Sequence, residues 1–403
     1  MFEDPYRYID EKRVQVEKLS ADKLALSKEA ALKSMVLLKN QNEVLPLKAD
    51  QKIAFIGPLV KDKRNVIGSW SAAGDWKYAT DIWQALETKY GANKFLFAKG
   101  CNLVQDKGMI EKLNRDGAML TLDPKSSQDL ISEAVETAKQ SDVVVAVLGE
   151  PFIMTGEAAS RSEIGLFSNQ MDLLKALKQT GKPIVLVLMN GRPMTLEWEN
   201  ANLNAILETW FAGTKAGDAI VDTLFGTANP SGKLSITFPR NVGQIPIYYN
   251  AKSTGRPFTP NEKFHSQYLD VPNTPLFPFG YGLSYTNFEY SDVSLSSPTL
   301  RPDQTLAITA TIKNTGRVTG VETAQLYVRD FVGSITRPVK ELKGFEKVEL
   351  KPGESKIVTF KLTSDDLPFY DSDLKYVAEP GEFQVFVGPN SDVSHFSRFV
   401  FAK

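Results

Sequence analysis

Uninterrupted apolar runs that alternate with helical patterns constrain the fold of this 403-residue chain more than any other feature. The clearest run covers 142–149, Asp-Val-Val-Val-Ala-Val-Leu-Gly, and a second covers 183–188, Pro-Ile-Val-Leu-Val-Leu. A strand without polar alternation is buried on both faces, which is typical of parallel sheets covered by helices. Further strands are predicted at 52–57, 95–97 and 205–209, and helices at 20–38, 80–90, 127–140, 169–179 and 216–225. The first half of the chain is therefore predicted to form an α/β three-layer sandwich around a mostly parallel sheet.

The pattern changes twice in the second half of the chain. From about 229 to 288, prolines recur too often for a long regular element, so this stretch is expected to wrap over a neighbouring surface or to carry function. After Tyr290, apolar residues alternate with period two, which predicts strands at 305–313, 323–330, 340–348, 355–362, 382–387 and 397–401. Short strands of this kind predict an all-β immunoglobulin-like or fibronectin-III-like sandwich. We therefore divide the chain into an α/β sandwich domain at 19–240, a wrapping segment at 241–289 and a β-sandwich at 290–403.

The composition argues against several classes of function. The 47 basic and 48 acidic residues leave a net charge of -1, and the basic ones are dispersed, so no nucleic-acid partner is expected. Cys101 is the single cysteine, and the two histidines, His265 and His395, lie far apart without metal-ligand spacing. No dinucleotide or P-loop motif is present, so neither a cofactor nor a metal is expected. No apolar stretch reaches the about 18 residues that span a bilayer, and the charged N-terminus is unlike a signal peptide, so no membrane partner is expected.

One connection is oversized for an α/β domain and carries polar groups that could act on a ligand. Residues 155–163, Thr-Gly-Glu-Ala-Ala-Ser-Arg-Ser-Glu, follow the strongest predicted strand. Ligands of open α/β sheets gather beyond the carboxyl ends of the strands. Glu157 could donate a proton there, and Arg161 could position it or bind substrate oxygens. The alternative is a solvated loop with a surface pair between Glu157 and Arg161.

These residues also carry a family resemblance. Residues 155–164 resemble the acid/base loop of family 3 glycoside hydrolases, the β-glucosidase and β-xylosidase group. Four further segments resemble the same family in the same order, at 34–40 (Ser-Met-Val-Leu-Leu-Lys-Asn), 190–193 (Asn-Gly-Arg-Pro), 229–234 (Asn-Pro-Ser-Gly-Lys-Leu) and 277–285 (Phe-Pro-Phe-Gly-Tyr-Gly-Leu-Ser-Tyr). The resemblance covers essentially the whole chain, and this ordered set of segments is highly specific.

The resemblance implies retaining hydrolysis of β-glucosides or short β-linked oligosaccharides by two carboxyl groups. It assigns the general acid/base to Glu157. The family's nucleophile is an aspartate in a separate (β/α)8 barrel, which is expected to precede this chain, with 1–18 as the linker after it. The chain alone is therefore expected to be inactive, or nearly so. The resemblance also implies a periplasmic or secreted location, and the exposed barrel-facing surface could support a homodimer.

Other residues near the expected site leave alternatives open. Trp70 and Trp76 could stack on sugar, or could be packed loop tryptophans. Asp75, in a Gly-Asp-Trp sequence, is a less favoured candidate nucleophile. The aromatic stretch at 277–285 is expected to clamp the two domains together rather than to bind sugar. The chain could also be a non-catalytic carbohydrate-binding or assembly module, or one subunit of a split enzyme.

Overall fold

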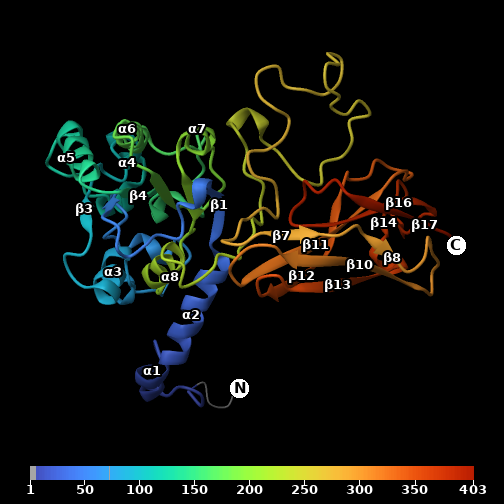
Figure 1. Ribbon diagram of the computed structural model, residues 1–403, viewed down its shortest axis with the longest axis horizontal. Coiled ribbons are helices and arrows are strands. Elements are labelled where there is room, and N and C mark those ends of the chain that lie inside the picture. Colours follow the sequence, from blue (N-terminus) through green and yellow to red (C-terminus); the bar gives the residue numbers. More distant parts are fainter. Residues whose placement is uncertain (1–5, 72) are drawn as a thin grey trace.

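The apolar runs form the centre of a six-stranded sheet in the computed structural model, which describes residues 6–71 and 73–403 (Figure 1). The sheet order is β1-β6-β5-β4-β2-β3, and every neighbouring pair is parallel except β1 with β6. The strands are β1 (Val36–Asn40), β2 (Ile53–Ile56), β3 (Leu96–Ala98), β4 (Val143–Gly149), β5 (Ile184–Met189) and β6 (Ala205–Glu208). All residues of β4 and β5 are buried, as the lack of polar alternation predicts.

Helices cover both faces of this sheet and separate two apolar cores. One core lies between the sheet and α2 (Ala21–Ser34), α3 (Ile82–Tyr90) and α8 (Ala216–Leu224), and the other lies under α5 (Ser127–Lys139) and α6 (Ser168–Lys178). Val145 and Val147 point into the first core, whereas Val144 and Leu148 point into the second. The predicted three-layer α/β sandwich is therefore confirmed. No helix in the described part of the chain combines the length and apolar character that crossing a membrane requires.

The sequence prediction was wrong at the start of this domain. We predicted one helix over 20–38, but α2 ends at Ser34 and the chain continues as β1. Val36, Leu37 and Leu38 are buried, and β1 pairs antiparallel with β6 at the edge of the sheet, with a register shift at Leu38. Burial in the sheet outweighs the helical spacing of these residues, since propensity is a weak prior against tertiary contacts.

Three short helices were not predicted. They are α1 (Glu11–Glu17), α4 (Lys107–Lys112) and α7 (Glu197–Asn202). The first lies inside the stretch at 1–18 that we predicted as a linker, and residues 1–5 of that stretch lie outside the described part of the chain.

The β-sandwich follows the predicted alternation. One sheet has the order β13-β10-β7, with β8 beside β10, and the other has the order β12-β11-β16-β17-β9. The strands are β7 (Phe288–Tyr290), β8 (Ser294–Leu295), β9 (Thr299–Leu300), β10 (Thr305–Asn314), β11 (Gly320–Asp330), β12 (Glu341–Leu350), β13 (Ser355–Thr363), β16 (Gly381–Gly388) and β17 (Phe396–Phe401), with a small hairpin of β14 (Phe369–Tyr370) and β15 (Tyr376–Val377). Their inward side chains form a third apolar core.

The stretch from 229 to 288 runs between the two domains, and much of it is drawn in yellow at the top of Figure 1. Phe277 packs in the α/β core and forms a β-bridge with Phe238. Gln325 of β11 donates a hydrogen bond to the carbonyl of Gly280 at 3.0 Å. The side chain of Lys233 makes an ion pair with the buried Glu322 at 3.2 Å. The aromatic stretch at 277–285 therefore contacts both domains, as a clamp would.

Candidate active site

Glu157 lies in the long connection between β4 and α6, beyond the carboxyl end of a central parallel strand. Its side chain is exposed and makes no hydrogen bond or ion pair with the described residues. Its neighbours have unusual backbones, because Gly156 has a φ of 89° and Ala158 a φ of 54°. Glycine adopts this left-handed region freely, but for alanine it costs about 1 to 2 kcal/mol. Contacts with the rest of the protein are therefore needed to hold the connection in this conformation.

The connection packs against the loop that follows β2. The hydroxyls of Ser69 and Thr155 lie 3.1 Å apart, and the backbone N–H of Phe152 donates to Asn65 Oδ1 at 2.8 Å. A Cβ atom on Gly156 would meet the indole of Trp70 at 3.4 Å. Trp70 is 75% exposed, so it presents an open aromatic face next to Gly156. This geometry suits stacking on a sugar ring, which stays a prediction.

Trp76 lies further along the same loop. It opens the 3-10 helix η3 (Trp76–Tyr78) and is half-buried, with the guanidinium of Arg64 4.9 Å from its ring centre. It lines a hollow of about 370 Å³ together with Arg64 and with Phe152 of the Glu157 connection. Asp75, the candidate nucleophile, is exposed and caps η3 by accepting a hydrogen bond from the N–H of Lys77 at 3.0 Å. The sequence-predicted residues thus gather at one edge of the sheet.

Arg161 does not form the surface pair with Glu157 that we considered. Its Nη1 donates to Glu150 Oε1 at 2.6 Å, and its Nη2 donates to the carbonyl of Gly165 at 3.1 Å. The guanidinium also lies 4.4 Å from the ring centre of Phe167. Its predicted contact with substrate oxygens stays a prediction.

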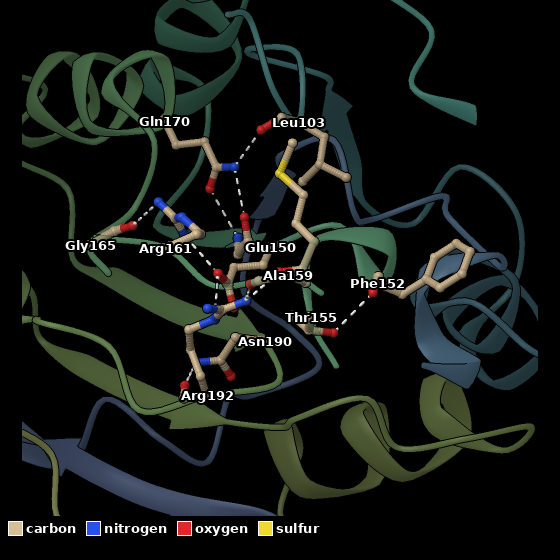
Figure 2. Close-up of polar contacts among 12 residues, drawn as sticks. Leu103, Glu150, Phe152, Thr155, Ala159, Arg161, Gly165, Gln170, Asn190 and Arg192 are labelled. Carbon is tan, nitrogen blue, oxygen red and sulfur yellow. Dashed lines mark hydrogen bonds and ion pairs between the residues drawn. The ribbon is translucent and has the colours of Figure 1, made fainter. Parts of the chain in front are cut away.

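The structure adds five residues to which the sequence analysis assigned no role in the site. Figure 2 labels Glu150, Gln170, Asn190 and Arg192, and the fifth residue is Glu208. Asn190 and Arg192 belong to the segment 190–193, which carried part of the family resemblance but no assigned role. The two carboxyls and the two amides are buried, and Arg192 bridges Glu150 and the Glu157 connection. A signal existed, since Glu150, Asn190 and Glu208 stand at the carboxyl ends of β4, β5 and β6. Polar residues that end three neighbouring parallel strands must meet at one edge of the sheet.

Gln170 fixes the end of β4 directly under this site. Its Oε1 accepts from the N–H of Gly149 at 2.9 Å, and its Nε2 donates to the carbonyls of Gly149 and Leu103 at 2.8 and 2.7 Å. Gly149 itself must be glycine, because a Cβ there would lie 1.8 Å from the carbonyl oxygen of Met189. The start of the Glu157 connection is therefore fixed by both side-chain and backbone contacts.

Glu208 is a buried carboxyl with one unsatisfied oxygen. Its Oε1 accepts from the N–H of Trp210 at 2.9 Å, whereas Oε2 and the nearby Asn190 Oδ1 have no hydrogen-bond partner among the described residues. Burial raises the pKa of Glu208 well above its ordinary value of 4.5, and the charge of Glu150 acts in the same direction. When Glu208 is protonated, one of its carboxyl oxygens can donate a hydrogen bond.

This raised pKa predicts a pH dependence of stability. Above about pH 4.5, Glu208 keeps a proton in the folded chain that it loses in the unfolded chain. Its contribution to the free energy of unfolding is therefore complete below about pH 4.5 and is lost as the pH rises. The Glu208→Gln variant, which is permanently neutral, should show a slope shallower by up to about 1.4 kcal/mol per pH unit above that pH. Urea unfolding of both proteins between pH 5 and 8 measures the difference. Parallel curves for the two proteins would show that Glu208 is ionised in the folded state.

No group of three His, Cys, Asp or Glu side chains arranged to hold a metal ion occurs in the part of the chain that the structure describes. His265 Nδ1 contacts the hydroxyl of Thr259 at 2.9 Å in the exposed wrapping segment, away from the sheet edge. The chemistry that the site offers is therefore that of the exposed carboxyls of Glu157 and Asp75, the nearby tryptophans and the buried charges of Glu150, Arg161 and Arg192.

Comparisons with known proteins agree with the fold. Residues 35–285 match the glycosyl hydrolase family 3 C-terminal domain, and residues 322–391 match the fibronectin type III-like domain. The chain is 50% identical over 397 residues to a periplasmic beta-glucosidase of Salmonella typhimurium, which covers 97% of this chain and 52% of the relative. It is 39% identical over 370 residues to a beta-xylosidase of Formosa agariphila, covering 90% of this chain and 48% of the relative.

A solved structure supports the same relationship. The crystal structure of a beta-glucosidase from Listeria innocua in complex with glucose is 38% identical and superposes with a TM-score of 0.88, covering all of this chain and 52% of that one. The chain thus spans about half the length of the curated relatives it matches. Its described residues form the α/β and fibronectin-type domains and include no (β/α)8 barrel. This chain belongs to glycosyl hydrolase family 3, of which it comprises the C-terminal α/β domain and the fibronectin type III-like domain.

Proposed function

We propose that this chain supplies the general acid/base to a retaining hydrolase of β-glucosides or short β-linked oligosaccharides. The observation that carries the proposal is the placement of Glu157, which stands exposed beyond the carboxyl end of β4 with Trp70 beside its loop. An exposed carboxyl without an internal partner is free to approach the oxygen of a bound glycoside. The names of the matched relatives supply the substrate class.

The reaction needs a second carboxylate, which we assign to an aspartate of a (β/α)8 barrel outside these residues. In the first step this aspartate attacks the anomeric carbon while Glu157 gives its proton to the departing glycosidic oxygen. In the second step Glu157 takes a proton from water, whose oxygen bonds to the anomeric carbon and releases the aspartate. We also propose a periplasmic location, on the printed name of the Salmonella relative. Association of two copies through the surface that would face the barrel stays a prediction.

Because one carboxylate of the pair is supplied elsewhere, the 403-residue chain alone is expected to show only background hydrolysis of an aryl β-glucoside. The test is a chimera in which the part of the Salmonella relative that lies outside the match is fused in front of this chain. The chimera should hydrolyse the aryl glucoside, and the chain alone should not. Release of the aryl group by the chain alone, lost on Glu157→Gln, would show that it holds its own nucleophile, and Asp75 is the first residue to replace.

The chimera also separates this proposal from a purely sugar-binding role. A folded chimera that binds glucose but does not hydrolyse the aryl glucoside would favour a non-catalytic carbohydrate-binding module. Hydrolysis that requires both parts would favour the proposal, whether the parts are joined or are mixed as separate polypeptides.

A further inference from the structure

The connection that carries Glu157 rests on a buried ionic cluster. Glu150 is 0% exposed, and both of its partners are arginines. Arg161 Nη1 lies 2.6 Å from Glu150 Oε1, and Arg192 Nε lies 3.1 Å from the same oxygen and 3.2 Å from Oε2. One negative and two positive charges thus meet under a loop that exposes its own carboxyl. Buried charges need partners and hydrogen bonds, so the three side chains hold one another in a single arrangement.

The remaining donors of the two arginines reach backbone carbonyls on both sides of Glu157. Nη2 of Arg192 donates to the carbonyl of Met154 and, at 2.9 Å, to that of Ala159. Nη2 of Arg161 donates to the carbonyl of Gly165 at 3.1 Å. Figure 2 shows Arg192 inserted between Glu150 and the segment that carries Ala159. One guanidinium therefore ties together a carbonyl three residues before Glu157 and a carbonyl two residues after it.

The backbone between these two anchors is the part of the loop that would otherwise relax. Gly156 and Ala158 both have positive φ, and the left-handed region is unfavourable for alanine. The side chain of Glu157 has no partner of its own in the described protein that could fix its direction. The carbonyl of Ala159, held by Arg192, is the anchor nearest to it on the C-terminal side. The backbone around Glu157 thus sets the position of its carboxyl, and Arg192 holds that backbone.

We infer that Glu150 and Arg192 are positioning residues, which hold the backbone on both sides of Glu157 so that its carboxyl meets the departing glycosidic oxygen. The inference rests on the proposed function of Glu157. Glu150 orients Arg192 through its two oxygens, and Arg192 orients the loop through the carbonyls of Met154 and Ala159. A displacement of about 1 Å at a reacting group lowers a rate by on the order of 100-fold. In this role both residues act through the loop, so their effect appears in the steps that need the Glu157 proton.

This consequence separates positioning from simple stabilisation. Departure of an alkyl alcohol needs a proton from the acid, whereas 2,4-dinitrophenolate leaves readily without one. Loss of positioning therefore harms hydrolysis of methyl β-glucoside far more than hydrolysis of 2,4-dinitrophenyl β-glucoside. Loss of folded protein lowers both rates by the same factor.

The experiment measures kcat/KM of the chimera on both substrates for Arg192→Gln, Glu150→Gln, Glu157→Gln and a control. The control is Arg337→Gln in the β-sandwich, where Arg337 is 11% exposed and pairs with Asp330 and Glu341 at 3.5 and 2.9 Å. Arg192 is similarly covered, at 18% exposed.

We expect Arg192→Gln and Glu150→Gln to lower kcat/KM on methyl β-glucoside by about 10- to 100-fold. On 2,4-dinitrophenyl β-glucoside, and in the control on both substrates, the loss should stay below about 3-fold. Arg192→Lys keeps the charge but not the fork of donors, so it should recover only part of the loss.

The outcomes distinguish the inference from the function on which it rests. If Glu157→Gln lowers kcat/KM by the same factor on both substrates, the proposed role of Glu157 fails. If Glu157→Gln discriminates between the substrates but Arg192→Gln and Glu150→Gln do not, Glu157 keeps its role and the positioning inference is wrong.

A second measurement uses the 403-residue chain and needs no activity. Hydrogen exchange of the amides at 150–167 should be faster by on the order of tenfold in Arg192→Gln than in the unmodified chain or in Arg337→Gln. The isosteric Glu150→Gln variant provides the same comparison if Arg192→Gln does not fold. Unchanged exchange across this segment in a folded variant would overturn the inference.

Discussion

Replacing Glu157 by glutamine in the chimera is expected to lower kcat/KM on methyl β-glucoside by about 10²- to 10⁴-fold. Glutamine has the same shape as glutamate but cannot donate a carboxylic proton to the leaving oxygen, nor accept one from water. The site has no other exposed carboxyl with the same support, since Glu157 alone lies between the carbonyls that Arg192 holds. Initial rates over a range of methyl β-glucoside concentrations measure the effect.

The matched control for this change lies in the same loop. Glu163 is also exposed and lines a separate hollow with Trp198 and Arg240, so Glu163→Gln should leave kcat/KM within about 3-fold of the unmodified chimera. A Glu157→Gln chimera as active as the Glu163→Gln chimera would rule out general acid/base catalysis by Glu157.

Replacing Phe238 by alanine is expected to lower the free energy of unfolding by about 3 to 5 kcal/mol. Phe238 is 0% exposed and packs edge-on against Trp210 and Phe277, with ring centres 6.0 and 6.3 Å apart. Its backbone also exchanges hydrogen bonds with the stretch at 276–277. Removal of this ring opens a cavity where the irregular stretch between the domains meets the α/β core, and a fixed backbone cannot close it.

Urea unfolding followed by tryptophan fluorescence measures this loss, and a second phenylalanine provides the control. Phe264, in the wrapping segment, is 76% exposed, so Phe264→Ala should change the free energy of unfolding by less than about 0.5 kcal/mol. Equal stabilities of the two variants would mean that Phe238 is not part of a cooperative core.

The local sequence was sufficient to predict those strands in which the pattern of apolar residues matches the burial of the side chains. The runs that form β4 and β5 could be recognised because every residue is apolar, and only a sheet covered on both faces buries such a strand completely. The strands β10 and β13 alternate as a sheet with one solvated face requires. By contrast, the segment 36–40 has spacing compatible with a helix, and its pairing with β6 depends on residues about 170 positions later in the chain.

The candidate site was predicted only in part, for a similar reason. Glu157 was found because its loop is long, polar and like a known motif. Glu150 was not found, and Arg192 was noted only within the segment 190–193, without a role. A glutamate after one strand and an arginine after the next show no connection until the sheet brings them together. Arg161 was noticed, but its pair with Glu150 was not foreseen, because the sequence does not show that the fold brings a buried carboxylate to it.

The sequence alone determined the two classes of domain, their order and the carboxyl that serves as the candidate acid. Hydrophobic periodicity and turn residues act over a few neighbours, so they can be read along the chain. Only the tertiary structure decided the antiparallel edge strand and the ionic cluster under the Glu157 loop. These depend on contacts between residues far apart in sequence, such as the 42 positions that separate Glu150 from Arg192, and their energies come from burial and charge pairing that exist only after the sheet has formed.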